Sequence, residues 1–459
     1  MAAETNHKKV IFITLFQGVA AKNILRTPIL TTLLSDGRIH IVLLARSSER
    51  SAYYAKEFAN DQITYEVVKM AKPSSFDWIF SKLKYVLLCT ETTDLQRKMR
   101  QETQGSSIWF MFDMMANRVF ARPFFRKIVR VLDYILVQDA TYGNFFEKYH
   151  PSLVFMTHLF DDQEIHLLRE AKKRGVRTVS LINSWDKVTA RCILRLLPDK
   201  LITYNEIVKK ELIQHNEVLR TDIFVGGIAQ YDSYFKEKRS SRDDFFKRIG
   251  LNPMKKLILY GSMGKAYSAS DWDMIDLLYR LKNEGAFGDG IEILVRFQPN
   301  DFINEAELKK RPHMRYDYPG TRFGEVRGTD WDMSSAELAH LGDTLAHMSL
   351  LVCYASSLSV DAAIFDKPVI NINFEVVKSA TMQESPTQYY KTAHYKKALD
   401  SGGIKLVGSE QELVSTVREY LGHPSNNEDG RRKLVASQCV FTDGLSGKRI
   451  GDFLLAYIR

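Results

Sequence analysis

The stretch 345–373 constrains the fold of this chain more than any other part of the sequence. Residues 349–354 form a short apolar run, which is typical of a strand buried on both faces of a parallel sheet. The run ends at Ser356 and Ser357, and apolar residues at helical spacing follow over 359–365. A second apolar run comes after this helix. The pattern predicts a strand, a tight turn, a helix and a further strand, which together are one unit of a doubly wound α/β sheet.

The serine turn in this stretch has the chemistry of a phosphate site. At such a turn, backbone N–H groups and the positive end of a helix dipole point into the crevice above the sheet. Asp361 follows Ser357 by about one helical turn, where its carboxylate can accept hydrogen bonds from ribose hydroxyls. An ordinary βαβ unit with a serine cap gives the same pattern, so this stretch alone leaves both interpretations open.

Length and charge narrow the class of protein. A chain of 459 residues is long enough for two or three domains. Its net charge of +9 favours an anionic partner, for which a sugar nucleotide, an anionic membrane surface and nucleic acid are candidates. The sequence shows no apolar signal core and no run near the ~20 apolar residues of a membrane span. We therefore expect a cytoplasmic protein whose contact with a membrane would be peripheral, at its inner face.

Strands alternating with helices are predicted over most of the first 240 residues. The apolar runs 10–15, 39–44 and 153–156 are typical of buried strands, and polar or glycine-rich clusters follow several of the strands. Ligands bind at the carboxyl ends of strands in open α/β sheets, so these clusters are candidate sites. The loop after the first strand contributes Gly18, Lys22 and Asn23.

A long helical stretch, from about residue 73 to residue 133, interrupts this alternation. Within it, arginines are interleaved with aromatic and aliphatic residues over 118–131. One interpretation is that this basic, amphipathic segment lies on an anionic bilayer and reaches a lipid-linked molecule there. The other is a helical subdomain that packs its aromatics on the core and leaves its arginines in solvent. Because the segment lacks any recognised nucleic-acid-binding module, no nucleic acid is expected as a partner.

A second α/β domain is predicted after a charged linker over 236–252. Its first strand breaks into the turn Gly261-Ser262-Met263-Gly264, and a later strand ends at Arg296, three residues before Pro299. The predicted domains are an N-terminal one over 1–240, a second over 252–440, and a C-terminal helix over 441–459 that is placed to pack back on the first.

The order of these motifs resembles the GT-B architecture of nucleotide-sugar glycosyltransferases, in which two Rossmann-like domains face each other across a cleft. The likeness lies in GSMG, then VRFQPN, then YASSLSVDAAIFDKPVINI. The last is similar to the donor-binding segment shared by UDP-N-acetylglucosamine 2-epimerases, CDP-glycerol glycerophosphotransferases and related bacterial surface-carbohydrate transferases. The resemblance covers the second half well and the first half loosely. It implies an α/β fold of two doubly wound domains, with a helical insertion in the first.

The resemblance also implies roles for residues of the second half. The glycine turn would approach the donor phosphates, Arg296 would pair with the pyrophosphate, the two serines would hold the distal phosphate and Asp361 the ribose. The donor residues implied in this way are Gly261, Ser262, Met263, Gly264, Arg296, Pro299, Ser356, Ser357 and Asp361. Gln298 stands where these transferases often carry histidine, so the donor base, uracil, cytosine or guanine, stays open.

An inverting sugar transfer needs a base that takes the proton of the acceptor hydroxyl. Asp186 is the leading candidate, since it follows a predicted strand and stands beside Trp185, which can stack on a sugar. The CDP-glycerol transferases resemble this with Trp-His-Gly at a similar place. His158 and Asp162, after the preceding strand, are the alternatives. A helix cap for Asp186 and a structural imidazole for His158 are open as well.

Two Asp-x-Asp patterns, at Asp271 and Asp330, are of the kind that binds metal in other glycosyltransferases. The first reads as a helix cap, whereas the second, in a predicted loop, stays open as a metal site. Because GT-B enzymes are usually metal-independent, we expect neither a metal nor a cofactor. The leading hypothesis is an enzyme that transfers sugar from a nucleotide sugar to a glycan or lipid-linked acceptor, in surface polysaccharide or glycolipid biosynthesis. The alternatives are a sugar-nucleotide 2-epimerase, a CDP-glycerol-type polyol-phosphate transferase and a nucleotide-binding scaffold.

Overall fold

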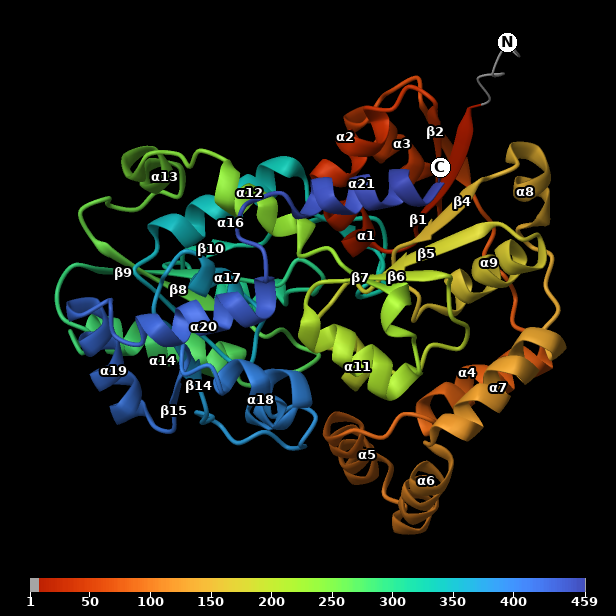
Figure 1. The fold of residues 1–459 in the computed structure, drawn as a ribbon. Coiled ribbons are helices and arrows are strands. Elements are labelled where there is room, and N and C mark those ends of the chain that lie inside the picture. The colour runs from red at the N-terminus through yellow and green to blue at the C-terminus, as the bar shows by residue number, and fades with distance from the viewer. Residues whose placement is uncertain (1–7, 459) are drawn as a thin grey trace. The chain divides into compact units, whose positions relative to one another are not determined.

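The fold consists of two compact units, each built around one parallel sheet (Figure 1). It is taken from a computed structural model that describes residues 8–458. Unit 1 comprises the described residues up to Asp94, 108–235 and those from Cys439 onward, and unit 2 comprises 95–107 and 236–438. Segment 95–107 thus groups with unit 2, although the sequence places it within the helical insertion of the first domain. The two sheets confirm the predicted fold class.

Unit 1 contains a seven-stranded sheet in the order β3-β2-β1-β4-β5-β6-β7, with every pair parallel. Its strands are β1 (Lys9–Leu15), β2 (Ile39–Ala45), β3 (Ile63–Val67), β4 (Leu153–Met156), β5 (Arg177–Leu181), β6 (Lys200–Thr203) and β7 (Ile223–Val225). β4 is buried throughout and β1 is buried from Ile11 on, because helices cover both faces of the sheet. The strand order reverses between β1 and β4, which is where a doubly wound sheet opens a crevice for ligands.

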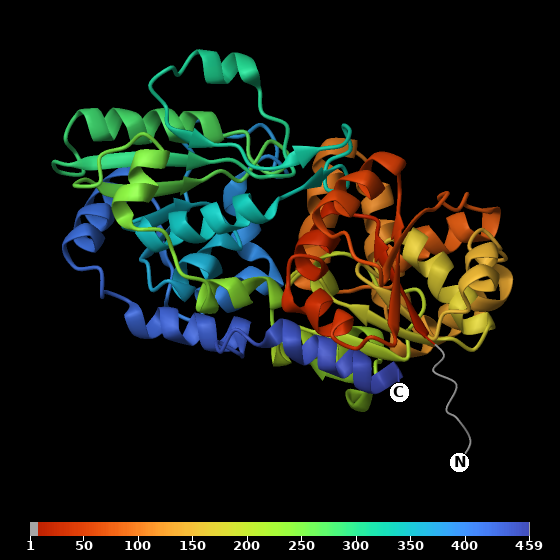
Figure 2. The same ribbon diagram turned by 90° about the horizontal axis from the view of Figure 1, so that it is seen from above.

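The helices of unit 1 are α1 (Gly18–Ile24), α2 (Pro28–Leu34), α3 (Ser48–Glu57), α4 (Ser75–Val86), α6 (Ser107–Phe120, within unit 1 from Ile108), α7 (Pro123–Leu136), α8 (Gly143–Tyr149), α9 (Asp162–Lys173), α10 (Lys187–Ala190), α11 (Glu206–Asn216), α12 (Asp232–Lys236) and α21 (Ser446–Ile458), with short 3₁₀ turns η1 (Arg220–Asp222) and η2 (Ala229–Tyr231). α21, near the C-terminus, runs beside α2 (Figure 2). The two approach closely because Gly451 has no side chain, and a Cβ there would lie 2.6 Å from Cβ of Thr32.

Unit 2 contains a six-stranded parallel sheet in the order β10-β9-β8-β13-β14-β15. Its strands are β8 (Lys256–Gly261), β9 (Ile291–Arg296), β10 (Tyr316–Asp317), β13 (Leu350–Cys353), β14 (Val369–Ile372) and β15 (Lys405–Val407), and β11 (Thr321–Arg322) and β12 (Trp331–Asp332) form a small antiparallel pair. Its helices are α5 (Glu91–Gln104, mostly in this unit), α13 (Arg242–Arg248), α14 (Asp271–Asn283), α15 (Glu305–Lys309), α16 (Ser335–His347), α17 (Leu358–Ile364), η3 (Pro386–Lys391), α18 (Ala393–Leu399), α19 (Glu410–Gly422) and α20 (Glu428–Cys439).

Two local expectations from the sequence are wrong. Gly18, Lys22 and Asn23 lie on helix α1 rather than in a loop, and Thr27 caps a second helix that begins at Pro28. The segment 236–252 begins where unit 1 ends, as expected for a linker, but it is part of unit 2 rather than a separate connection. It forms α13, whose Arg242 donates hydrogen bonds of 2.6–2.9 Å to three carbonyl oxygens of unit 2.

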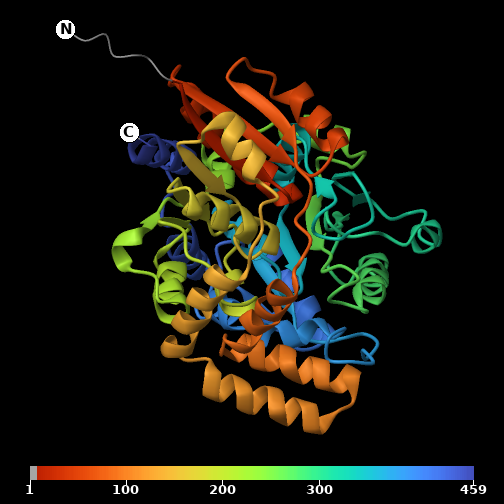
Figure 3. The same ribbon diagram turned by 90° about the vertical axis from the view of Figure 1, so that its right-hand side faces the viewer.

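Helix α7 buries three of its four charged residues and exposes most of its apolar ones. Arg126 and Arg130 are buried and both form ion pairs with Glu217, at 2.6 and 2.8 Å. Phe124, by contrast, is 66% exposed. The interpretation in which the aromatics pack on the core and the arginines face solvent is therefore wrong for this helix, which lies with α4 above α6 in the lower part of Figure 3. Among the helices within 8–458, none is both long and apolar enough to span a bilayer.

Candidate functional site

A buried carboxylate organises the carboxyl edge of the unit 1 sheet. Glu164, near the start of α9, accepts hydrogen bonds from the Thr14 hydroxyl (2.6 Å) and from the backbone N–H of His158 (2.7 Å). Thr14 belongs to β1 and His158 follows β4, so the carboxylate joins the ends of the two central strands. Burial raises the pKa of Glu164 to about 7. This side chain can therefore change its protonation state near neutral pH.

Lys187 and His158 form a polar pair above this carboxylate. The Lys187 ammonium, at the first position of α10, donates to Nε2 of His158, which is therefore the neutral, accepting nitrogen. Burial and the neighbouring ammonium lower the pKa of His158 well below its usual value. Burial also lowers the pKa of Lys187 to about 8. Within residues 8–458, Lys187 makes no ion pair with a carboxylate, so the site favours an added anion.

Several buried polar atoms at the same edge have no hydrogen-bond partner among residues 8–458. Asn183, after β5, is only 6% exposed, and neither atom of its amide group is bonded. The same holds for Oδ1 of Asn23 and Nδ1 of His158, and both residues are also buried. An unsatisfied buried amide costs about 1–3 kcal/mol. Such groups are rare in folded proteins and are explained most simply by a polar ligand.

The structure brings Asp186 and His158 into one cluster but places Asp162 in another. Asp186 precedes α10, accepts a hydrogen bond from the Ser184 hydroxyl and is one of the charges that act on Lys187. Its side chain makes no cap bond, so the helix-cap interpretation does not hold. Trp185 beside it is half-buried. Asp162 instead accepts from Lys84 (2.7 Å) and Arg195 (2.9 Å), which favours an ion-pair role over proton transfer.

Replacing Glu164 by glutamine should change how the free energy of unfolding depends on pH. The Glu164 carboxyl has a pKa of about 7 in the folded protein, raised from the ordinary value of 4.5. The protonated carboxyl therefore contributes its full stability to the fold below about pH 4.5, and this contribution is lost as the pH rises through 7. Glutamine keeps the protonated geometry, with NH₂ toward the hydroxyls and oxygen toward the His158 N–H. As the pH rises from acid to alkaline values, the free energy of unfolding of the variant should therefore increase relative to that of the wild type by up to about 3 kcal/mol.

Urea unfolding at a series of pH values measures this difference. Because both proteins share all other titrating groups, the wild-type curve subtracted from the Glu164→Gln curve isolates the one carboxyl. Glu206→Gln, at an exposed position of the same unit, serves as the control and should give a flat difference. A flat difference for Glu164→Gln as well would show that Glu164 is ionised at ordinary pH values.

In unit 2, Asp271 binds the glycine turn that follows β8. Its carboxylate accepts from the hydroxyls of Tyr260 (2.7 Å) and Ser262 (2.8 Å) and from the backbone N–H groups of Met263 (3.2 Å) and Gly264 (2.7 Å). Burial raises the pKa of this carboxyl. Asp271 is thus the first residue of α14, as the cap interpretation requires. Its carboxylate, however, binds the glycine turn rather than the N–H groups of its own helix. The two N–H groups predicted to approach a phosphate are already bonded.

Arg296 lies at the end of β9, as predicted, and is held by an acid. Its guanidinium contacts Asp317 at 3.3 Å, and His340 contacts the same carboxylate oxygen at 3.0 Å. Two residues further on, Gln298 donates to the carbonyl of Met263 (2.6 Å) and accepts from Arg327 (3.1 Å). The residue that replaces the expected histidine therefore fixes the turn after β8. Pro299 is half-buried, and its carbonyl accepts from Arg322.

The serine turn lies between β13 and α17, as predicted, and rests on a buried polar network. Ser356 accepts from the backbone N–H of Leu358 (3.2 Å), and its own N–H donates to the Tyr395 hydroxyl (3.1 Å). Tyr395 also donates to Asn371 at 2.6 Å. Ser357 is exposed and makes no side-chain cap bond, while Asp361 is 8% exposed. The hydroxyl of Ser357 is therefore the accessible one of the pair.

Replacing Gly264 by alanine should destabilise the glycine turn strongly. Its φ is +85°, and a Cβ would lie 2.6 Å from Oδ2 of Asp301. Asp301 cannot move without losing its bond from the Lys265 N–H (2.7 Å). We expect a cost of about 3 kcal/mol, the sum of about 1 for the backbone and about 2 for the clash. The matched control is Gly402→Ala, at φ +73° with open space around it, which should cost only about 1 kcal/mol in urea unfolding. Equal losses of stability for Gly264→Ala and Gly402→Ala would show that the turn can move to accommodate the added methyl group.

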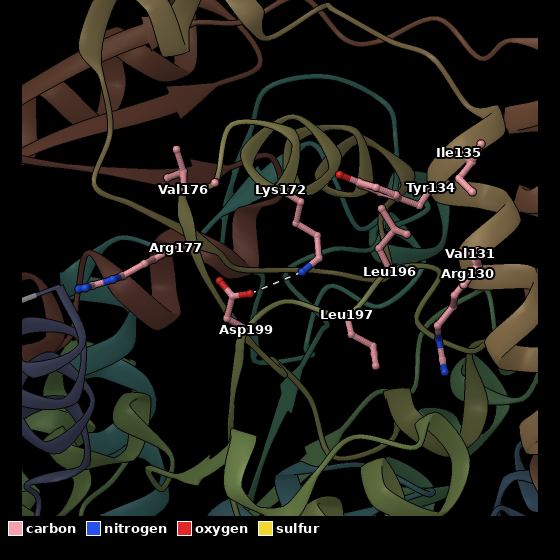
Figure 4. A pocket seen from close by; sticks show the side chains of 11 residues that line it. Arg130, Val131, Tyr134, Ile135, Lys172, Val176, Arg177, Leu196, Leu197 and Asp199 are labelled. Carbon is pink, nitrogen blue, oxygen red and sulfur yellow. Dashed lines mark hydrogen bonds and ion pairs between the residues drawn. The ribbon is translucent and has the colours of Figure 1, made fainter.

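A pocket of about 610 Å³ lies at the opposite edge of the unit 1 sheet, where β5 and β6 begin (Figure 4). It is lined by Arg130, Val131, Tyr134, Ile135, Lys172, Gly175, Val176, Arg177, Leu196, Leu197 and Asp199. Lys172 and Asp199 contact each other at 3.5 Å across it. None of the residues predicted to bind or transform a ligand lines this pocket.

The comparisons with solved structures concern the whole chain. The UDP-GlcNAc 2-epimerase from Neisseria meningitidis, bound to UDP-GlcNAc, matches with a TM-score of 0.55 and 12% identity over 97% of this chain and 99% of that one. S. aureus MnaA, solved with UDP, matches with a TM-score of 0.54 and 11% identity over 98% and 97%. The chain has the GT-B fold.

The GT-B assignment does not depend on a single match. The UDP-GlcNAc 2-epimerase from Methanocaldococcus jannaschii gives a TM-score of 0.52 at 13% identity, over 98% of this chain and 99% of that one. No family model and no curated protein matches the sequence. At such identities the likeness establishes the fold, and the chemistry of the site must be argued from the residues themselves.

Proposed function

We propose that the protein is a glycosyltransferase that moves a sugar from a nucleotide diphosphate sugar to a glycan or lipid-linked acceptor. The supporting observation is the cluster at the carboxyl edge of the unit 1 sheet. There a cationic Lys187 faces the neutral His158, and the amide of Asn183 is buried without a partner. A cation without a carboxylate and an unsatisfied amide fit a ligand that carries both phosphate and hydroxyl groups.

In the proposed reaction, Asp186 takes the proton of the acceptor hydroxyl as that oxygen attacks the anomeric carbon. Trp185 stacks on a sugar, and Gly18, Lys22 and Asn23 of α1 belong to the acceptor side. The bond from the anomeric carbon to the phosphate oxygen breaks, and the nucleoside diphosphate leaves with the bonding electron pair. Inversion follows if the attack is in line with that bond. No metal and no cofactor is assigned a role.

On the donor side, the structure supports some assignments better than others. Asp271 already accepts from the N–H groups of Met263 and Gly264, so the turn Gly261–Gly264 serves mainly to shape the edge of the sheet. Within unit 2, the phosphate contacts are therefore assigned to Ser356, Ser357 and Arg296, and the Arg296 guanidinium would be shared between the phosphate and Asp317. Asp361, one helical turn further on, remains the proposed ribose partner.

Thermal unfolding in the presence of nucleotides tests the proposal. UDP, CDP, GDP and their sugar conjugates are compared with inorganic pyrophosphate, which carries the charge without the base. One nucleotide diphosphate at a hundred times its dissociation constant should stabilise the protein by about 2.7 kcal/mol. Lys187→Met should weaken the effect, and stabilisation by none of the nucleotides would contradict the proposal.

A 2-epimerase is the second candidate, because titratable groups gather around one point of unit 1. Asp186 and Glu164 both act on the charge of Lys187, which bonds to His158, and the His158 N–H donates to Glu164. An epimerase needs such groups close to the reacting sugar. Incubation of UDP-N-acetylglucosamine without an acceptor separates the two. An epimerase forms the 2-epimer under these conditions, whereas a transferase needs the acceptor, and turnover of CDP-glycerol would mark a polyol-phosphate transferase.

A further inference from the structure

Helix α7 presents an apolar face to solvent. Six large apolar residues at helical spacing are exposed along it, namely Phe124, Ile128, Val131, Leu132, Ile135 and Leu136. The opposite face contains Arg126, Arg130 and Asp133, all buried in ion pairs with the rest of unit 1. A helix on the surface of a globular protein normally has these faces the other way round. The ion pairs fix the orientation of α7, so its apolar face is held outward.

Helices α4 and α6 of the same unit expose further apolar side chains. Those of α4 are Phe76, Trp78, Ile79 and Tyr85, and those of α6 are Ile108, Trp109, Met111, Phe112, Met115, Val119 and Phe120. Trp109 is 74% exposed. α6 is held to the segment after α4, because Asn117 donates to the carbonyls of Val86 (2.6 Å) and Leu88 (2.8 Å). Contiguous exposed apolar surface of this kind marks an interaction site.

The exposed charges on these helices are all positive. α4, α6 and α7 contain three acids, of which Asp77 and Asp133 are buried and Asp113 is half-buried. The exposed charged residues are Lys82, Arg118 and Lys127, together with Arg122 between α6 and α7, and of these Arg118 is paired with Asp94 at 2.6 Å. On these three helices, exposed cations lie among tryptophan, phenylalanine and isoleucine, and no acid is exposed. Such a surface complements one that has an apolar interior and negatively charged groups at its boundary with water.

We propose that the exposed faces of α4, α6 and α7, here called the helical surface, dock on an anionic lipid bilayer. A second copy of the chain fits less well. In a symmetric dimer the same patch meets itself, which would bring the cations of one helical surface against those of the other with no exposed acid between them. In a bilayer the apolar side chains enter the acyl boundary and the cations stay at the headgroups.

The pocket at the amino edge of the unit 1 sheet extends the helical surface. Val131 and Ile135, from the exposed face of α7, also line that pocket, where Leu197 adds apolar area (Figure 4). In the same lining Lys172 is paired with Asp199, so Arg177 supplies the added positive charge. The apolar and cationic character of α7 therefore continues past the end of the helix, which enlarges the area available to lipid.

Co-sedimentation of the full chain with vesicles tests the proposal. Vesicles of equal parts phosphatidylcholine and phosphatidylserine are compared with vesicles of phosphatidylcholine alone, at low and high salt. The wild type should partition to the anionic vesicles, and less so at high salt. Arg122→Glu with Lys127→Glu should lower partitioning about tenfold or more, since each removed cation contributes about fivefold. Phe124→Gln with Val131→Gln and Ile135→Gln should lower it about a hundredfold.

Matched controls come from exposed positions of unit 1 outside the helical surface. Lys210→Glu and Leu219→Gln change charge and apolar area to similar degrees and should leave partitioning unchanged. All substituted residues are exposed, so far-UV circular dichroism and nucleotide stabilisation should match the wild type, which keeps this test separate from the proposed catalytic function. The proposal is overturned if the wild type does not bind anionic vesicles or if the triple variant still binds them. It is also overturned if the wild type is a dimer that does not bind vesicles and the triple variant is a monomer, because the helical surface would then be a dimer interface.

Discussion

Asp186→Asn should lower the turnover of sugar transfer by about 10²–10⁴-fold, the usual contribution of a general base. Asparagine has the shape of aspartate and can still accept from the Ser184 hydroxyl, but it cannot take a proton from an acceptor. Binding of the donor should change little, because the substitution removes a proton acceptor and not a phosphate contact. Initial rates with the nucleotide sugar found by thermal unfolding, together with the donor dissociation constant, measure both effects.

Two further variants show whether the loss comes from the base itself. Ser184→Ala leaves the carboxylate in place but frees its orientation, so we expect a smaller loss, about tenfold. Glu206→Gln removes a negative charge at an exposed position of the same unit and should leave the rate unchanged. If Asp186→Asn keeps full turnover while donor binding is intact, proton transfer belongs to another group, and His158 is the next to replace.

The strands of both sheets could be predicted from the sequence because their signal is local. The apolar run 349–354 became β13 (Leu350–Cys353), and 10–15 became β1 (Lys9–Leu15), since an uninterrupted apolar run of this length has few other stable arrangements in a soluble protein. The helix start at Pro28 was not predicted, although it has a local signal, because proline restricts the residue before it and favours the first helical position.

The orientation of α7 could not be predicted in the same way. Its helical period divides the residues into an apolar face and a charged face, but the period does not say which face is buried. That choice depends on Glu217, about ninety positions along the chain, whose carboxylate pairs with both Arg126 and Arg130. Without that partner, burial of the two guanidinium groups would be prohibitive.

The candidate site shows the same limit. Asp186 and Trp185 were found because they follow a strand, and position along the chain is enough for that. Lys187, one residue further on, acquires its importance only from His158 on the neighbouring strand end. Asp271 looks like an ordinary first-turn acid in the sequence, and its hold on the glycine turn appears only when β8 and α14 are placed together. A side chain that acts across elements leaves no local pattern.

Asp133→Ala should cost about 3–5 kcal/mol of the free energy of unfolding, because it leaves buried cations without their acid. The Asp133 carboxylate, on α7, accepts from Arg169 (2.6 Å) and from Arg195 (2.7 and 3.0 Å), and all three side chains are at most 2% exposed. Arg195 keeps Asp77 and Asp162 as partners in the variant. Arg169 loses the one carboxylate that it contacts among residues 8–458 and retains a contact with His166. Urea unfolding at neutral pH measures the loss.

Two companion variants separate charge from shape. Asp133→Asn keeps an accepting oxygen and should cost less than Asp133→Ala, whereas Asp133→Leu with Arg169→Leu removes both charges and should recover part of the loss, since a buried pair replaced by apolar residues is often no less stable. The same ion pairs hold the apolar face of α7 outward, so Asp133→Ala should also loosen that helix and weaken partitioning to anionic vesicles. A cost below about 1 kcal/mol would mean that water reaches these groups, and that α7 is oriented by its apolar contacts instead.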